Sequence, residues 1–143
     1  MRSFKEWTLA QLDKTFQLQA LDNSPVLEQW LTGAAELSDF DRQVLRSFQK
    51  ILHTHVHDWN ETELAYNFIG PVMAFAHFSS KQFNFFAQRA VSGTVDDIEM
   101  GGRPDGMIAS GFREPEQPYF CFQEYRGEKY PEGDPAAQTL AAM

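Results

Sequence analysis

Two short motifs in the last third of the chain constrain its fold more than any other feature. Residues 102–106 read Gly-Arg-Pro-Asp-Gly and contain Asp105, and residues 122–126 read Phe-Gln-Glu-Tyr-Arg at the end of an aromatic run. Side chains two positions apart on a strand point to the same face, so Glu124 and Arg126 should project together. The pattern predicts an Asp and a Glu on neighbouring strands, which suits a metal site beside a cation.

The two motifs together resemble the signature of the PD-(D/E)XK nuclease superfamily. That signature is an Asp on one strand, then a Glu or Asp, one residue and a Lys on the next strand. Pro104-Asp105 matches the first half and Glu124-Tyr125-Arg126 the second, with Arg126 in place of the Lys. The resemblance implies a restriction-endonuclease-like α/β fold and a metal-dependent DNA endonuclease that hydrolyses phosphodiester bonds.

The same resemblance implies a site and its cofactor. Asp105 and Glu124 would be the ligands of Mg²⁺ or Mn²⁺, because hard divalent cations take oxygen ligands and keep several waters. Arg126 would supply charge and phosphate contacts, although a guanidinium does not readily act as a general base. Family members also carry an acidic residue on the first core helix and a Gln on the second. Glu63 and Gln138 occupy those places and complete the implied catalytic set.

Each of these residues also has a simpler interpretation. Asp105 fits an ordinary turn before a glycine, and Glu124 with Arg126 fits an ion pair on a sheet face. Glu63 fits the capping box of its helix, and Gln138 fits a solvated helix position. Arg126 and the acidic composition favour an alternative function, a noncatalytic nuclease-like module for nucleic-acid or protein interaction.

Composition excludes several classes of protein. The net charge of −8 argues against strong nonspecific binding to nucleic acid, which depends on Lys and Arg replacing phosphate counterions. The single cysteine, Cys121, excludes a disulfide framework and a cysteine-based zinc cluster. No apolar run approaches the roughly 20 residues that cross a bilayer. We therefore expect a soluble cytoplasmic protein with no membrane partner. The resemblance to the nuclease superfamily implies DNA as its partner, and whether the protein forms a homodimer is left open.

The first part of the chain predicts three helices. Residues 2–20 have a rough amphipathic spacing, and Pro25–Thr32 follows a serine with proline at the first helical position. A third helix should begin after the Ser38 cap and end near His57. These helices form the predicted N-terminal helical extension over residues 1–58.

Residues 59–143 predict the α/β core. A capping box at Asn60 starts a helix that Pro71 should bend or split, and a turn at Gly133 precedes the last helix. The order of helix, three strands and helix is the leading part of the αβββαβ core of the superfamily. Because the pattern stops at Met143, we expect the C-terminal part of this αβββ(α) core to be truncated. The predicted elements after the first helix are strands over 83–91, 106–109 and 119–126 and a helix over 136–143.

Two further features are candidates for a role in a site. His53 and His57 share a helix face at a spacing that can chelate zinc, with Asp58 nearby, while His55 points elsewhere. The simpler interpretation is a polar helix end, where imidazolium complements the helix dipole. Lys129, beyond the expected strand end, is a remote substitute for the lysine of the family signature.

Overall fold

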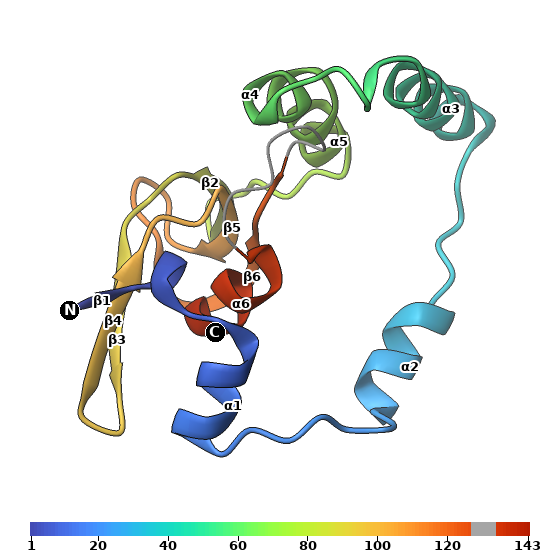
Figure 1. The fold of residues 1–143 in the computed structure, drawn as a ribbon. Coiled ribbons are helices and arrows are strands. Elements are labelled where there is room, and N and C mark those ends of the chain that lie inside the picture. The colour runs from blue at the N-terminus through green and yellow to red at the C-terminus, as the bar shows by residue number, and fades with distance from the viewer. Residues whose placement is uncertain (127–133) are drawn as a thin grey trace.

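A computed structural model describes residues 1–126 and 134–143 of the chain (Figure 1). In this part the protein has a mixed α/β fold with two three-stranded sheets. The predicted turn at Gly133 and the remote Lys129 lie outside the described residues. The strands are β1 (Arg2–Ser3), β2 (Phe83–Ala87), β3 (Val91–Val95), β4 (Ile98–Gly102), β5 (Gly106–Ser110) and β6 (Glu116–Gln123).

Helical elements fill most of the first half of the chain and return after β6. Figure 1 shows the blue N-terminal helix beside the red C-terminal helix, and the green helices grouped at the opposite end of the molecule. They are the 3-10 helix η1 (Phe4–Glu6), α1 (Leu9–Phe16), α2 (Pro25–Thr32), α3 (Asp39–His55), α4 (Glu61–Leu64), the π-helical η2 (Ala65–Ile69), α5 (Gly70–Phe75) and α6 (Pro135–Ala142).

The chain passes from one sheet to the other at Asp105. The first sheet has the order β1-β4-β3, with β1 parallel to β4 and β3 antiparallel to it. The second sheet has the order β2-β5-β6 and is antiparallel throughout. Only residues 103–105 separate the end of β4 from the start of β5. Asp105 is therefore fixed at the junction of the two sheets.

The strand predicted over residues 83–91 is too long, because β2 occupies Phe83–Ala87 and Val91 already begins β3. The β3–β4 hairpin was missed as well. Its turn is Asp96-Asp97, with both residues at positive φ, of 48° and 63°. Asn-Gly or Asp-Gly is the usual signal for such a turn, so the pair Asp96-Asp97 does not predict a hairpin. The strand predicted over 119–126 ends at Gln123, so Glu124, Tyr125 and Arg126 lie just after β6 and not on the strand.

The single helix predicted over residues 2–20 is also wrong. The structure divides this segment into β1, η1 and α1, because Thr8 is extended and caps α1 in a capping box with Gln11. Side chains from η1, α1 and the residues between them then enter the hydrophobic core, where Phe4, Trp7 and Leu12 are buried. Part of the predicted extension over residues 1–58 is thus built into the core.

The remaining helix predictions agree closely with the structure. Pro25–Thr32 is α2, with Ser24 as its cap, and α3 begins after the Ser38 cap. Pro71 has no N–H to donate and its ring crowds the preceding turn. The helix widens before it, where the Gly70 N–H donates to the Ala65 carbonyl. The helix is not split at Pro71, because the backbone stays helical from Glu61 to Phe75, but it changes to π-helical hydrogen bonding over Ala65–Ile69.

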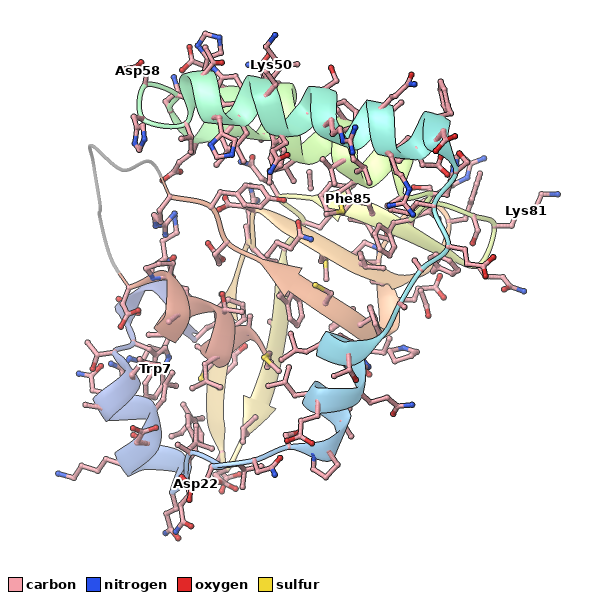
Figure 2. The ribbon with its side chains drawn as sticks, turned by 90° about the vertical axis from the view of Figure 1, so that its right-hand side faces the viewer. Trp7, Asp22, Lys50, Asp58, Lys81 and Phe85 are labelled. Carbon is pink, nitrogen blue, oxygen red and sulfur yellow. The ribbon has the colours of Figure 1, made fainter. Side chains whose placement is uncertain are left out.

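Helices α3, α4 and α5 lie together on one side of the β2–β5–β6 sheet. Phe48 of α3 packs edge-to-face on Phe75 of α5, with ring centroids 6.2 Å apart. The Gln123 amide of β6 contacts the Met73 sulfur of α5 at 3.8 Å, and Figure 2 shows Phe85 on this side of the sheet. No helix in the described ranges is long and apolar enough to span a membrane.

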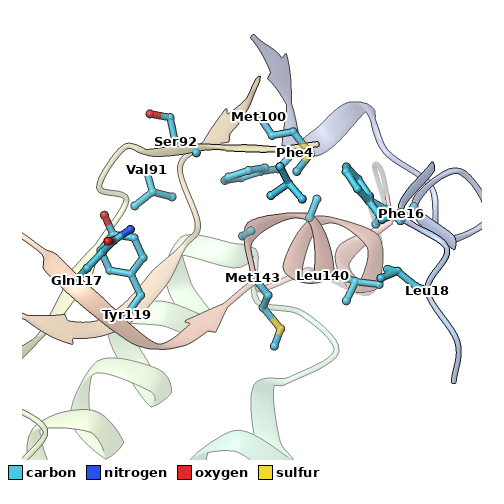
Figure 3. Close-up of a pocket in the computed structure, with 15 residues that line it drawn as sticks. Phe4, Phe16, Leu18, Val91, Ser92, Met100, Gln117, Tyr119, Leu140 and Met143 are labelled. Atoms are coloured by element: carbon cyan, nitrogen blue, oxygen red, sulfur yellow. The ribbon is translucent and has the colours of Figure 1, made fainter. Parts of the chain in front are cut away.

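An apolar cavity of about 370 Å³ lies where α1 and α6 meet the β1–β4–β3 sheet and β6 (Figure 3). Phe4, Phe16 and Leu140 line one part of it, and Val91 and Tyr119 another. The cavity is separate from the junction at Asp105, which does not line it.

Candidate active site

The pairing of β5 with β6 brings the two predicted motifs together. Gly106 is the register partner of Gln123, so the next residues outward, Asp105 and Glu124, meet where both strands end. The Asp105 Oδ2 accepts a hydrogen bond from the Tyr125 backbone N–H at 2.7 Å. This bond anchors the turn before β5 to the segment after β6.

Glu124 is the more perturbed of the two acids. Its side chain is 6% exposed, and burial is the main cause that raises its pKa to about 7. The charge of Asp105 and a hydrogen bond between the two carboxyl groups raise the pKa further, while the positive charges of Arg126 and Lys5 lower it. The two carboxyl groups therefore face one another, with one of them partly protonated at neutral pH.

Arg126 connects three parts of the fold. Its Nη1 donates to the Tyr125 carbonyl at 3.0 Å and to the Glu61 Oε1 of α4 at 3.4 Å. Its Nη2 donates to the Gln138 Oε1 of α6 and lies 3.9 Å from the Glu124 Oε2. The side chain is 16% exposed, so Arg126 is held inside the site by groups from two helices and its own strand end.

Glu61, which the sequence did not single out, joins this cluster, and the predicted Glu63 does not. Glu63 is exposed, and its carboxylate accepts from the Asn60 backbone N–H at 2.8 Å in the predicted capping box. Residues two apart on a helix point in nearly opposite directions. Once Glu63 turns back to cap the helix, Glu61 faces the other way, toward Arg126. The sequence signal for Glu61 is that it is an acidic residue in the first turn of the helix, on the face opposite Glu63.

Gln138 is in the cluster and is not a solvated helix residue. It is 1% exposed on α6 and accepts from Arg126. Tyr125 is ordered as well, because its hydroxyl donates to the Gln123 Oε1 at 2.6 Å. Burial raises the Tyr125 pKa to about 12, which keeps this hydroxyl protonated.

The carboxyl groups of Asp105 and Glu124 match what a hard divalent cation needs. Across the part of the chain that the structure describes, no cluster of three or more His, Cys, Asp or Glu side chains is arranged to hold a metal. A Mg²⁺ site commonly uses one or two carboxylates, with waters and substrate phosphate supplying the other oxygens. Two neighbouring carboxyl groups, of which that of Glu124 is nearly buried, are such a donor set. The Tyr125 carbonyl, another oxygen close to the pair, accepts a hydrogen bond from Arg126.

Neither the scan against protein-family models nor the searches of curated proteins and solved structures found a match to this chain. The functional assignment therefore depends on the chemistry of the site, since a fold by itself does not determine a function.

Proposed function

We propose that this protein is a metal-dependent DNA endonuclease of the PD-(D/E)XK type, which hydrolyses phosphodiester bonds with Mg²⁺ or Mn²⁺ at Asp105 and Glu124. The observation that carries the proposal is the meeting of these two carboxyl groups, with the pKa of Glu124 raised to about 7. A cytoplasmic location and a DNA partner belong to the same proposal.

The electrostatics of the pair support a cation at this position. Two carboxylates that face one another at a nearly buried site repel, and one of them takes up a proton unless a cation is present. A bound divalent cation would polarise a phosphodiester and lower the pKa of a water molecule. Asp105 and Glu124 would hold the cation, and Arg126 would keep Glu124 in place.

The order of the elements around the pair also supports the proposal. Helix α4, strands β2, β5 and β6, and helix α6 follow one another in the order of the αβββ(α) core. Asp105 directly precedes the second of these strands and Glu124 directly follows the third. The β3–β4 hairpin is an insertion between the first and second of them, and it pairs with β1 in a sheet of its own.

The hydrogen bonds of Arg126 favour a second function. In the family the cation of the signature acts on the attacking water, whereas Nη1 and Nη2 of Arg126 are engaged by Glu61, Gln138 and the Tyr125 carbonyl. This arrangement suits a noncatalytic module that keeps the fold for nucleic-acid or protein interaction.

Cleavage assays separate the two functions. Supercoiled plasmid and a labelled duplex oligonucleotide are incubated with the protein in Mg²⁺ or Mn²⁺, beside Asp105→Asn, Glu124→Gln and the control Glu116→Gln. Glu116 is an exposed acid at the other end of β6. We expect cleavage by the wild type and the control, and its loss in the two site variants. Cleavage that persists in both site variants would rule out this active site, and no cleavage by any protein would favour the noncatalytic module.

A further inference from the structure

The guanidinium group of Arg126, the cation of the second motif, is poorly placed to contact a substrate. Arg126 is 16% exposed, and its terminal nitrogens donate to groups on α4, α6 and its own main chain. Its Nε is buried and makes no hydrogen bond within the described residues. A phosphate could reach this guanidinium only by displacing Glu61 or Gln138. A phosphodiester at the carboxyl pair therefore needs a different positive charge.

The N-terminal segment brings a lysine to the same place. Lys5 follows Phe4, whose ring fills the space above Gly102, where an added Cβ would lie 2.5 Å from it. Phe4 is buried in the core cluster that includes Ala137 and Ala141 of α6. Helix η1 thus packs between β4 and α6. Strand β4 ends three residues before Asp105, and α6 carries Gln138.

The backbone of Lys5 is fixed by a hydrogen bond, whereas its ammonium group extends into solvent. Its N–H donates to the Ser3 Oγ at 3.4 Å, and the Glu6 carboxylate is occupied by the Ser3 N–H in the same capping box. The residue is exposed, and no carboxylate in residues 1–126 or 134–143 forms an ion pair with its ammonium group. Helix η1 contacts both the strand that leads into Asp105 and the helix that carries Gln138. The Lys5 side chain therefore extends from an element that packs next to the carboxyl pair.

We propose that Lys5 is the cation that binds the substrate phosphodiester at the Asp105–Glu124 pair. This inference rests on the proposed function and adds to it a substrate-binding residue from the opposite end of the chain. A lysine ammonium is a compact point charge on a flexible stem, so it can follow a phosphate that enters from solvent. Binding one phosphate also releases counterion, which makes substrate affinity depend more steeply on salt.

The test compares Lys5→Met and Lys5→Arg with Lys14→Met, a control at an exposed lysine on α1. Initial rates of cleavage of a fluorescent duplex oligonucleotide are measured in Mn²⁺ at several salt concentrations. We expect Lys5→Met to raise KM about tenfold, the loss of one charged hydrogen bond, with a smaller change in kcat. The plot of log KM against log salt should become shallower by about one. Lys5→Arg should retain most of the affinity, and Lys14→Met should match the wild type.

The outcomes distinguish this inference from the proposed function. A wild type that cleaves, with Lys5→Met and Lys14→Met alike in KM and salt dependence, would overturn the role of Lys5 alone. A wild type that does not cleave would overturn the endonuclease. In that case, binding of the same oligonucleotide, measured by fluorescence anisotropy, still tests whether Lys5 contacts a phosphate. Weaker binding by Lys5→Met than by Lys14→Met supports its phosphate contact, and equal or absent binding overturns it.

Discussion

The Asp105 carboxylate accepts a hydrogen bond from the Tyr125 backbone N–H at 2.7 Å. Because this bond uses one carboxylate oxygen and a main-chain donor, it fixes Asp105 independently of the neighbouring side chains. The other partner of the site, Glu124, is then placed by the strand register. The pair is consequently preorganised by the backbone, which makes its behaviour testable by side-chain changes alone.

Metal affinity should rise with pH around neutrality. Glu124 must lose its proton to bind a cation, and its pKa is about 7. We expect the affinity for Mn²⁺, measured by isothermal titration calorimetry, to be weak at pH 6 and to level off above pH 8. Glu124→Gln should bind weakly at every pH. An affinity that is flat between pH 6 and pH 8 in the wild type would contradict this assignment of Glu124.

The same raised pKa should make Glu124 a source of instability at alkaline pH. The folded state keeps a proton that the unfolded state loses between pH 4.5 and about 7, so this contribution to stability is present below 4.5 and lost by about 7. The shift corresponds to about 3 kcal/mol at most, and solvent screening should reduce it to about 1–2 kcal/mol. Urea unfolding should show Glu124→Gln gaining stability over the wild type from pH 4.5 to pH 8, whereas Glu116→Gln should show no such gain.

Arg126 and Gln138 should be energetically coupled. Removing either partner leaves a buried polar group without its hydrogen bond, which costs about 1–3 kcal/mol. Arg126→Met and Gln138→Leu should each destabilise the protein by this amount, and the double variant by less than the sum. Chemical denaturation of the four proteins measures the coupling. Additive losses would mean that the contact between the two side chains does not contribute to stability.

Gly106 should not tolerate a side chain. An added Cβ would lie 2.8 Å from both the Phe85 ring and the Tyr125 hydroxyl oxygen, and such overpacking costs about 1–3 kcal/mol. Gly93 of β3 is the matched control, because nothing lies within 4 Å of a Cβ there. Thermal unfolding should therefore show a lower Tm for Gly106→Ala and little change for Gly93→Ala. Equal Tm values would show that Phe85 and Tyr125 can move aside.

Local signals in the sequence were enough to predict features that depend on a few neighbouring residues. Ser24 and Pro25 indicated the start of α2 and Gly33 its end, and Asn60 with Glu63 indicated the start of α4. These signals work because the hydrogen bonds that end a helix are made within one turn. The change to π-helical hydrogen bonding before Pro71 is also a local effect, because it accompanies a single residue that lacks an N–H.

Features that depend on distant residues were not predictable. Nothing near Lys5 in sequence indicates that η1 packs beside α6, and only the finished packing decides whether Glu61 or Glu63 faces Arg126. The β3–β4 hairpin was missed because its turn lacks the glycine that usually allows positive φ. The site was recognised through two motifs, whereas the groups that position and complement it come from α4, α6 and η1.

The packing of η1 against α6 also affects how the protein is made. Phe4 leaves the ribosome long before Ala137 and Ala141, which belong to the same core cluster. A nascent chain that lacks these alanines leaves Phe4 without its partners, so closure of the core must wait until they are synthesised. Contacts between such distant residues are slow to form, and incomplete chains with exposed apolar surface are prone to aggregate. We expect synthesis of this protein to depend on protection of its N-terminal segment until α6 emerges.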